Sequence, residues 1–344
     1  MKLRPFAVVL AAMLLLSSCG SNTTTSAPPS PNEGDAGNVG APAPDVSEAP
    51  GRDLLALAEE IDFDPESYTD IVSNVPYIDD GKDWHLLDLY GTQRSADVAP
   101  TVIEVHGGGF ISGSKENNAD HSIFFAERGY KVIVPEYGKI PNQGDFKSAV
   151  QELFAVFHWA EDNADIYGFD LNNIFLSGDS AGGYYTLLCC AIFHSLELQE
   201  YFGVTLPGFQ FSACVTSCPR TEVRSIREAL DSGKGTAGRI AQIIGEELLM
   251  DDDLMDHMDL TMCVAPEAFS GLFMNTTPGD KDTGATVLAF DAYLTENGIE
   301  HTMISYNGVE NELKHTFNIS YAHYPESKVA NQDMADYLNS KTSN

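Results

Sequence analysis

The sequence predicts an α/β fold, in which a mostly parallel central sheet carries helices on both of its faces. Apolar strand patterns alternate with helical patterns from about residue 68 onward. Hydrophobic residues make up 43% of the 344-residue chain, which is enough to build a large core. Alternating β and α units form parallel sheets, and such sheets bind ligands at the carboxyl ends of their strands. We therefore expect the functional residues at these strand ends.

Seven strands and four helices are expected along the folded part of the chain. The expected strands cover residues 84–90, 101–105, 131–135, 173–176, 209–216, 270–275 and 302–306. The expected helices cover 119–128, 146–157, 181–193 and 285–297, and Gly298 stops the last of them. In the second helix, apolar residues recur every three or four positions, which is typical of an amphipathic helix; they are Phe146, Ala149, Val150, Leu153, Phe154 and Phe157.

Residues 219–265 interrupt this alternation. Ile240, Ile243, Ile244, Leu248 and Leu249 predict a short amphipathic helix, and an acidic stretch from Asp251 to Asp259 follows it. The stretch lacks the central Gly and the final Glu of a calcium-binding loop, so we interpret it as a solvated face. We expect the whole segment to be a small cap insertion that packs over the edge of the sheet.

The chain is strongly acidic. It has 19 Lys and Arg against 51 Asp and Glu, so its formal net charge is 19 − 51 = −32. Proteins that bind nucleic acid generally carry a basic face, and this charge would repel phosphate backbones. We therefore exclude a general nucleic-acid binder. The same long-range repulsion disfavours highly anionic substrates, although physiological salt screens it.

The N-terminus has the composition of a targeting segment. Lys2 and Arg4 precede an apolar run at residues 6–16, which is too short to span a bilayer and is typical of an export signal. The following Leu-Ser-Ser-Cys-Gly run, with Cys19 as its fourth residue, resembles the lipobox of bacterial lipoproteins. That resemblance implies a signal peptide at residues 1–18, lipidation of Cys19 and anchoring to the outer face of a bacterial membrane. An ordinary cleaved signal with a nearby cysteine is the alternative.

Residues 19–50 are expected to form a tether behind the lipidated cysteine, and residues 51–344 the folded domain. Residues 20–50 contain six Pro and four acidic residues but no aromatic or basic residue. Such a segment cannot bury enough surface to offset its chain entropy. We interpret it as an extended linker that holds the folded domain away from the membrane.

Five cysteines remain when Cys19 is set aside: Cys189, Cys190, Cys214, Cys218 and Cys263. An odd number cannot all pair within one chain. We favour buried free thiols, with a bridge between Cys214 and Cys218 as the alternative. The sequence has no Cys/His set at zinc spacing, and we expect neither a metal nor an organic cofactor.

The strongest motif is Gly-Asp-Ser-Ala-Gly-Gly at residues 178–183, a G-x-S-x-G between an expected strand and an expected helix. In this context the serine sits on a sharp turn that projects its hydroxyl, and the flanking glycines avoid clashes with the neighbouring strand and helix. The motif predicts Ser180 as a nucleophile. A glycine-rich turn with an incidental serine is the structural alternative.

A second motif, His-Gly-Gly-Gly-Phe at residues 106–110, ends an earlier expected strand. A glycine run there lets backbone N–H groups approach a substrate oxygen. We expect an oxyanion hole formed by Gly108, Gly109 and Ala181, the residue after the nucleophile. A flexible loop or a phosphate cradle is the alternative, although no Gly-Lys-Ser/Thr follows. His106 is expected to orient the loop.

These two motifs, in this order, resemble those of the α/β-hydrolase superfamily, in particular the esterase/lipase group related to hormone-sensitive lipase and bacterial carboxylesterases. The resemblance covers roughly residues 80–340 and implies the α/β-hydrolase fold. The Val-Pro-Glu-Tyr run that ends at Tyr137 lies where the group often has Asp-Tyr-Arg, and Gly138 replaces the usual Arg.

The resemblance also implies the rest of a catalytic triad, in the chain order Ser, Asp/Glu, His. The group's G-x-x-D pattern selects Asp282, with Asp280 as the alternative acid. The group's H-x-F pattern selects His315 as the base. His301 precedes the last expected strand and would lie at the wrong end of the sheet, and His323 is a weaker alternative.

Together these features predict a serine hydrolase that works through an acyl-enzyme. The resemblance implies carboxylic esters of short to medium acyl length as its substrates, and export beside polymers outside the cell favours acetyl esters on a polysaccharide. The substrate is expected to be a small-molecule ester or an ester borne on a polymer. Two alternatives stay open. One is a non-catalytic surface lipoprotein built on a hydrolase scaffold, and the other is a peptidase of the same fold.

Overall fold

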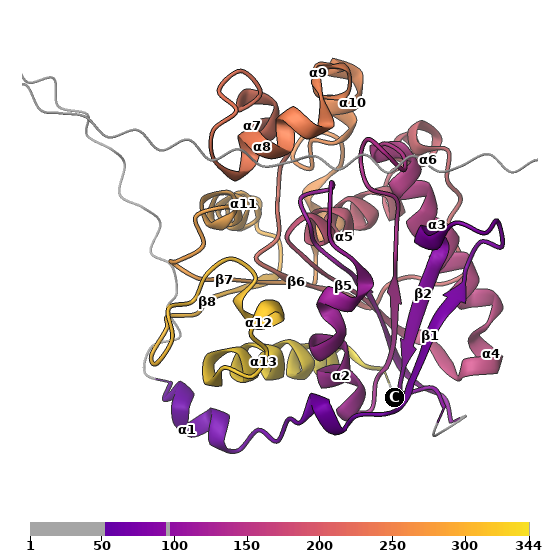
Figure 1. Ribbon diagram of the computed structural model, residues 1–344, viewed down its shortest axis with the longest axis vertical. Helices are drawn as coiled ribbons and strands as arrows, with labels where there is room; N and C mark the ends of the chain where they lie inside the picture. The colour runs from indigo at the N-terminus through magenta and orange to yellow at the C-terminus, as the bar shows by residue number, and fades with distance from the viewer. Residues whose placement is uncertain (1–51, 94–96, 344) are drawn as a thin grey trace, which may run out of the picture. The chain divides into compact units, whose positions relative to one another are not determined.

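The computed structural model describes residues 52–93 and 97–343, and in this part of the chain eight strands form one sheet (Figure 1). Their order across the sheet is β1-β2-β4-β3-β5-β6-β7-β8. The pairs β1–β2 and β2–β4 are antiparallel, and all other neighbours are parallel. The strands are β1 (Ile71–Pro76), β2 (Leu86–Tyr90), β3 (Ala99–Val105), β4 (Lys131–Pro135), β5 (Phe169–Asp179), β6 (Ala213–Ser217), β7 (Leu272–Thr276) and β8 (His301–Ser305).

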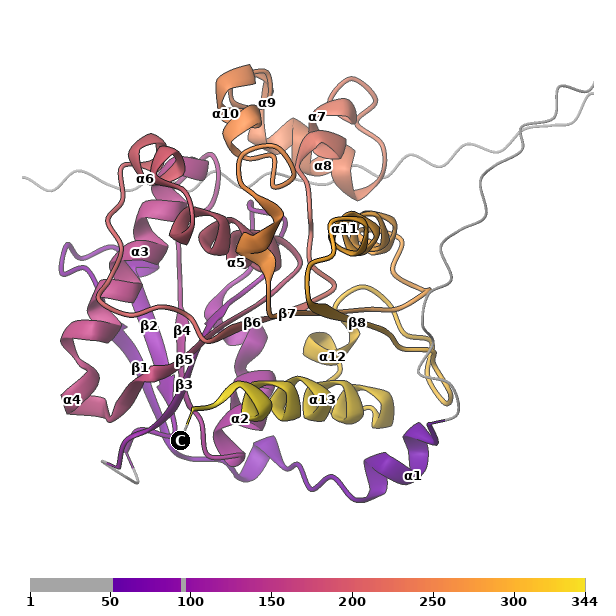
Figure 2. The ribbon, with the colours of Figure 1, turned by 180° about the vertical axis from the view of Figure 1, so that it is seen from behind.

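Helices cover both faces of the sheet, as Figures 1 and 2 show. One face carries α3 (Phe146–Asp162), α5 (Ser180–Phe193) and α11 (Gly284–Glu296), and the other carries α2 (Ala119–Glu127) and α13 (Pro325–Lys341). The remaining helices outside residues 219–265 are short. They are α1 (Leu54–Glu59), α4 (Ala164–Tyr167), α6 (Leu196–Phe202) and α12 (Phe317–Ser320).

The central strands are apolar on both faces because helices cover both. In β4 all five residues are buried, and successive side chains point to opposite faces. Ile133 therefore packs in the larger core on the α3 and α5 face, whereas Val132 and Val134 pack in the core on the α2 and α13 face. This explains why the central strands read as continuous apolar runs rather than as alternating ones.

The segment 219–265 folds into four short helices. They are α7 (Arg224–Glu228), α8 (Gly235–Ile244), α9 (Glu246–Leu249) and α10 (Asp252–His257). The single helix expected over the isoleucines and leucines is divided at Gly245, whose φ of 91° ends α8. The acidic stretch is ordered by its own contacts, because Asp251 caps α10 and Asp259 pairs with Arg224.

Three strands differ markedly from the expectation. The strand expected at residues 173–176 is β5, which extends from Phe169 to Asp179. β1 was not expected, because its residues are only half-buried or exposed and Asn74 has a φ of 61° within it. The strand expected at residues 209–216 begins only at Ala213, and Phe209 and Phe211 instead pack against each other before it. The apolar residues before Ala213 predict a strand, but their aromatic rings pack together in a loop.

All five cysteines in the described part of the chain are free thiols. The sulfur of Cys214 lies 2.7 Å from that of Cys190, so the contact that it makes is with α5 and not with Cys218. The bridge between Cys214 and Cys218, kept open above, is absent from the structure.

The expectations for residues 1–50, including the signal peptide, the lipidated Cys19 and the tether, lie outside the described residues. Within the described ranges, no helix has the length and apolar character needed to cross a bilayer.

Candidate active site

The predicted nucleophile lies on a sharp turn between β5 and α5. Ser180 has a φ of 50°, a left-handed conformation that costs a non-glycine residue free energy and persists only where the surroundings enforce it. The backbone of β3 lies very close to this turn, because a Cβ on Gly182 would lie 2.1 Å from the carbonyl oxygen of Val105. A Cβ on Gly178 would lie 2.5 Å from Oγ1 of Thr186. The two glycines of the motif therefore let β3 and α5 pack against the strained turn.

His315 lies beside this serine. Its Nε2 atom is 2.8 Å from Oγ of Ser180, and its Nδ1 atom is 3.0 Å from Oδ2 of Asp280. The loop between β8 and α12 carries His315, so a ring from far downstream in the chain reaches the β5–α5 turn. A neutral imidazole that donates its Nδ1–H to the carboxylate can accept the serine proton at Nε2.

The carboxylate on the ring belongs to Asp280, and not to Asp282 as the G-x-x-D pattern predicted. The Asp280 carboxylate also accepts hydrogen bonds from the backbone N–H groups of Asp282 and Thr283, at 2.9 and 3.0 Å, and from the Thr283 hydroxyl at 2.7 Å. The side chain of Asp282 is exposed instead. The sequence selected the wrong member of the pair because two carboxylates lie two positions apart in one loop, and only the loop's conformation decides which points inward.

The environment of Asp280 favours its charged form. Burial acts to raise the pKa of Asp280, but the hydrogen bond and charge of His315, together with the hydrogen bonds from Thr283, lower it to about 2. This carboxylate is therefore ionised at neutral pH and can stabilise an imidazolium on His315.

The other histidines that were considered lie elsewhere. His301 is the first residue of β8, and its Nε2 atom lies 2.9 Å from the carboxylate of Asp291. The ring of His323 packs edge-on against Tyr324, 4.9 Å between centroids. Of the three histidines weighed from the sequence, His315 is the one that the structure brings to Ser180.

The loop after β3 presents two backbone amides near the serine. Among the described residues, the N–H groups of Gly108 and Gly109 donate to no protein acceptor, and both residues line the pocket that contains Ser180. Gly108 has a φ of 129°, and a Cβ there would lie 1.9 Å from the carbonyl oxygen of Ser112. Ala181 lies in the first turn of α5, where N–H groups have no partner within the helix.

Asp179, which was not among the predicted site residues, ties this loop to the nucleophile turn. The N–H of Gly107 donates to its Oδ1 atom at 2.9 Å, and Asn118 donates to the same oxygen at 2.9 Å. Burial raises the pKa of Asp179, while the hydrogen bond from Asn118 acts to lower it. The only sequence signal was its place as the x before the motif serine, which carries no role in a G-x-S-x-G pattern.

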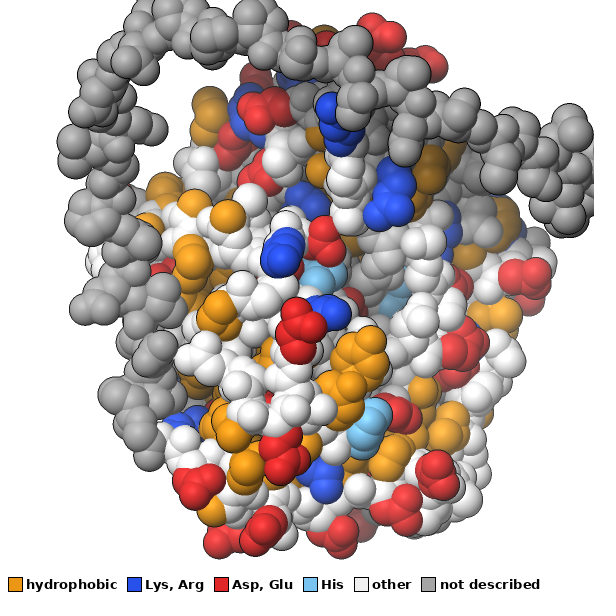
Figure 3. Space-filling model, turned by 60° about the vertical axis from the view of Figure 1, so that its left-hand side comes forward, with side chains coloured by type: hydrophobic (Ala, Val, Ile, Leu, Met, Phe, Trp, Pro, Cys, Tyr) orange, Lys and Arg blue, Asp and Glu red, His pale blue; other side chains and the backbone are white. Residues whose placement is uncertain are grey.

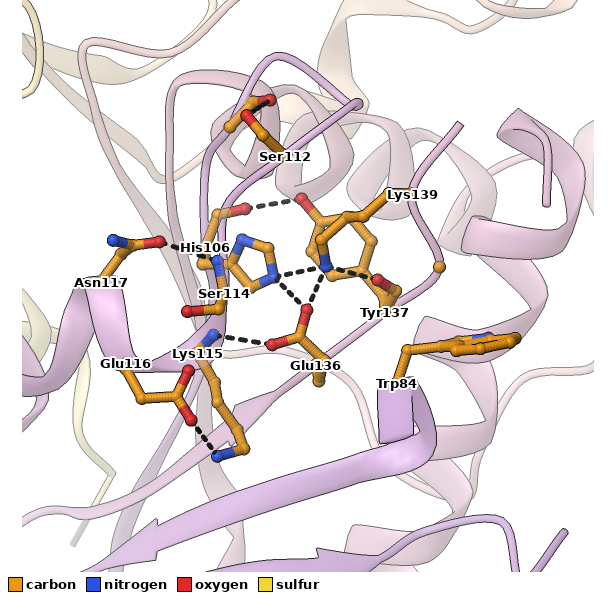
Figure 4. Close-up of polar contacts among 12 residues, drawn as sticks. Trp84, His106, Ser112, Ser114, Lys115, Glu116, Asn117, Glu136, Tyr137 and Lys139 are labelled. Atoms are coloured by element: carbon orange, nitrogen blue, oxygen red, sulfur yellow. Dashed lines mark hydrogen bonds and ion pairs between the residues drawn. The ribbon is translucent and has the colours of Figure 1, made fainter. Parts of the chain in front are cut away.

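A polar cluster holds His106 behind the loop (Figure 4). The ring of His106 stacks on Tyr137 at 4.4 Å between centroids, and its Nε2 atom lies 3.3 Å from Glu136 and 3.2 Å from Nζ of Lys139. Tyr137 donates its hydroxyl to the carbonyl oxygen of His106 at 2.7 Å. His106 therefore faces this cluster, as expected of a residue that orients the loop.

Gly138 stands where the related group often has an Arg, and the positive charge of this cluster lies instead on the next residue, Lys139. Gly138 packs tightly on Glu152, to which its N–H donates at 2.7 Å, and the next residue, Lys139, contacts Glu136. Burial acts to raise the pKa of Glu136, but His106 and Lys139 lower it to about 2. A partly buried ion pair between Glu136 and Lys139 therefore packs against His106 of the loop.

The serine opens into a pocket of about 460 Å³. Ile111 after the loop and Ile240 and Ile243 of α8 form an apolar wall. Arg220 and Arg239 add charged groups. The segment 219–265 thus contributes part of the pocket wall.

One cluster in the described part of the chain has the composition of a metal site. The ligand atoms of Cys218, Asp280 and His315 lie within 4.8 Å of one another. Nδ1 of His315 and the Asp280 carboxylate already bind each other, and Cys218 is a fully buried thiol whose pKa burial raises. The cluster therefore supports the ring and the acid of the site.

Comparison with known proteins shows the family to which the fold and the site correspond. The model of the BD-FAE family matches residues 87–282. Hormone-sensitive lipase of Mus musculus is 33% identical over 107 residues, which is 31% of this chain and 13% of that protein. A probable isoprenylcysteine alpha-carbonyl methylesterase of Arabidopsis thaliana is 33% identical over 133 residues, 35% of this chain and 31% of that protein. The chain thus spans less than a third of the length of either relative.

Solved structures match over most of the chain. Esterase B from Lactobacillus Rhamnosis superposes with a TM-score of 0.71 at 26% identity, over 83% of this chain and 90% of that one. The same esterase in a tributyrin phosphonate-inhibited form gives a TM-score of 0.69 at 25% identity, over 84% and 90% of the two chains.

Proposed function

The chain belongs to the BD-FAE family and has the α/β-hydrolase fold, and from this premise we propose that it is a carboxylesterase working through Ser180, His315 and Asp280. The observation that carries the proposal is the continuous set of contacts from the Ser180 hydroxyl through the His315 ring to the Asp280 carboxylate, at 2.8 and 3.0 Å. A nucleophile, a base and an orienting acid at these distances suit acyl transfer.

In the first half of the proposed reaction, Nε2 of His315 takes the proton of the Ser180 hydroxyl while Oγ attacks the ester carbonyl carbon. The resulting imidazolium is stabilised by the ionised Asp280. His315 then returns the proton to the alkoxy oxygen, the C–O bond breaks, the alcohol leaves, and an acyl-serine remains. In the second half, His315 deprotonates a water molecule, which attacks the acyl carbon and releases the acid and the free serine.

The tetrahedral intermediates of both halves carry a negative oxygen. The N–H groups of Gly108, Gly109 and Ala181 are the donors that we assign to it. The amides of Gly108 and Gly109 have no acceptor in the described part of the chain, so each is available to a substrate oxygen. Removing one donor of this kind costs about 10²–10³ in rate.

The proposed substrates are esters of short to medium acyl length, or acetyl esters. The pocket of about 460 Å³ with its apolar wall suits such acyl groups. The resemblance to an esterase that a tributyrin phosphonate inhibits supports the same size class. A non-catalytic role and a peptidase role are the competing functions that the following experiment addresses.

The experiment is hydrolysis of 4-nitrophenyl butyrate by the wild type and by Ser180→Ala, together with mass spectrometry after treatment with an alkyl phosphonate. We expect activity in the wild type only, and one phosphonyl adduct on the peptide that contains Ser180. Equal rates for the two proteins, or an adduct absent from that peptide, would remove the proposal. A peptidase would also cleave chromogenic peptide anilides, which we expect this protein to leave intact.

We also propose that the protein is exported and anchored through lipid on Cys19. The proposal rests on the lipobox-like run and the preceding apolar segment of the sequence. Metabolic labelling with an alkynyl fatty acid in a bacterial host should mark the wild type and leave Cys19→Ser unlabelled. Equal labelling of both, or of neither, contradicts lipidation at this residue.

A further inference from the structure

The pocket of the proposed esterase contains a buried arginine next to the nucleophile. The backbone N–H of Arg220 donates to the carbonyl oxygen of Ser180 at 2.8 Å, which fixes Arg220 beside the reacting group. Its side chain is 4% exposed. Because Arg220 is also part of the pocket lining, a substrate in the pocket meets this residue directly.

The Arg220 guanidinium is only partly satisfied by the protein. Among the described residues, its side chain makes one hydrogen bond, from Nη1 to Oγ of Ser225 at 3.2 Å, and one ion-pair contact, with Oε1 of Glu222 at 3.9 Å. An Arg side chain has five N–H donors. Burial lowers the pKa of Arg220 by more than the nearby carboxylates, Glu222 first among them, raise it. The buried cation therefore lacks a full set of acceptors.

Other arginines of the chain are better paired. Arg52 contacts Asp333 through two nitrogens at 2.6 and 2.8 Å, and Arg224 contacts Asp259 at 2.8 Å. Arg227, in the same short helix as Arg224, lies 2.7 Å from Asp252. Arg128 has no carboxylate partner in the described part of the chain, but it donates to Gln332 at 2.7 Å and to the carbonyl oxygen of Phe124 at 2.9 Å. Against these partners, the 3.2 Å hydrogen bond and the 3.9 Å ion-pair contact of Arg220 are weak.

A second arginine lines the same pocket. Arg239 is an exposed residue of α8, and it has no carboxylate partner within the described ranges. Figure 3 shows a face of the molecule on which Lys and Arg side chains, with Asp and Glu side chains among them, lie near histidine side chains. Two cations from different segments thus converge on one pocket.

The acidic side chains near these cations have other partners or face solvent. The carboxylate of Asp280, which is not part of the lining, binds His315, and that of Asp179 binds the oxyanion loop. Asp282, which lines the pocket and whose charge acts on Arg220, is exposed. This inference rests on the proposed esterase function. We propose that Arg220 and Arg239 form a subsite for a carboxylate group, so that the enzyme prefers esters carrying a carboxylate near the scissile bond.

The chemistry of arginine favours this ligand. The planar guanidinium matches a carboxylate with two parallel N–H···O bonds, and such charge-assisted bonds are about twice as strong as neutral ones. The net charge of −32 opposes anions at long range, but salt screens charges beyond about 8 Å. A single carboxylate in contact with a buried cation is therefore governed by the contact and not by the distant surface.

The test compares ester pairs in which a methyl ketone replaces the carboxylate. For a carboxylate in the acyl group, the pair is monoethyl succinate and ethyl levulinate. For a carboxylate in the alcohol, it is acetoxyacetate and acetoxyacetone. Acid release in a pH-stat gives kcat/KM for each. We expect the carboxylate ester to exceed its neutral partner at least about tenfold in one pair. Ratios near one or below in both pairs would overturn the subsite.

Variants test which residues are responsible. Arg220→Gln and Arg239→Gln should each lower the ratio of carboxylate to neutral ester, and Arg220→Lys should keep part of it. Arg227→Gln is the matched control, since it removes an arginine of the same segment outside the pocket lining, and its ratio should stay within about twofold of the wild type. If the preference for the carboxylate ester persists in both Arg220→Gln and Arg239→Gln, other residues cause it and the proposal is contradicted.

The outcomes separate this inference from the proposed function. If neutral esters are hydrolysed and the phosphonate labels Ser180 while no carboxylate preference appears, only the subsite fails. If no ester of either kind is hydrolysed, the esterase proposal fails first. Should Arg220→Gln not fold, the wild-type ratio and Arg239→Gln still decide the question. If acetylated neutral sugars are cleaved faster than both carboxylate esters, the subsite binds sugar hydroxyls and the carboxylate proposal is wrong.

Discussion

The carboxylate of Asp179 accepts the backbone N–H of Gly107 at 2.9 Å and so joins the loop after β3 to the nucleophile turn after β5. The two glycines that follow Gly107 are the proposed oxyanion donors, and the residue after Asp179 is the proposed nucleophile. One buried hydrogen bond therefore links the turn that carries the proposed nucleophile to the loop that carries the proposed oxyanion donors.

Asp179→Ala should weaken catalysis more than substrate binding. Loss of the acceptor frees Gly107, and the amides of Gly108 and Gly109 then lose their fixed position. We expect kcat to fall about tenfold to hundredfold, less than the full removal of a donor, with KM changed less. Steady-state kinetics on 4-nitrophenyl butyrate measures both. Asp170→Ala, at the other end of β5, is the matched control, and an equal loss there would contradict a specific role for Asp179.

The two carboxylates of the loop after β7 should differ in effect by at least about a hundredfold. Asp280→Asn removes the group that orients His315, and the corresponding change in a serine triad costs about 10⁴ in kcat. Asp282→Asn alters an exposed carboxylate of the pocket rim, and its loss should be much smaller. The measurement is kcat for each variant. A larger loss for Asp282→Asn would restore the acid that the sequence pattern selected.

The ion pair under the oxyanion loop should make stability depend on pH. The folded pKa of Glu136 is lowered to about 2 from an ordinary value of 4.5. The contribution of Glu136 to the free energy of unfolding is therefore fully present above about pH 4.5 and is lost as the pH falls toward 2. Urea unfolding between pH 5 and pH 2.5 should show a smaller decline for Glu136→Gln, by about 3 kcal/mol at most. Glu296→Gln, on the exposed end of α11, should decline as the wild type does, and a parallel decline of both variants would contradict the assignment.

Gly182→Ala should destabilise the fold as a whole. The added methyl would lie 2.1 Å from the backbone oxygen of Val105, and no rotation of a side chain relieves a contact with backbone. We expect a loss of about 3 kcal/mol or more in the free energy of unfolding, which is the range for severe overpacking. Gly129→Ser is the comparison, because a Cβ there meets no atom within 4 Å, although its φ of 89° adds local strain. Similar stability of Gly182→Ala and the wild type would contradict the packing argument.

Much of this molecule can be predicted from its sequence, because burial on both faces leaves apolar runs in β3, β4 and β7, and a fixed motif marks the β5–α5 turn. The rest depends on three-dimensional detail. The half-buried strand β1 has no clear period, and the choice between Asp280 and Asp282 depends on one loop conformation. Asp179 acts through Gly107 and Asn118, and Arg220 through its place beside Ser180, which are all distant in the chain, so no local pattern points to them.

The coupling between Ser180 and His315 is tested most directly by kcat for Ser180→Ala, His315→Ala and the double variant on 4-nitrophenyl butyrate. Residues that act as one catalytic unit are strongly non-additive. The account predicts that the double variant is no slower than the slower single variant. Rates that fall by the product of the two single effects would show that the serine and the histidine act independently and would contradict it.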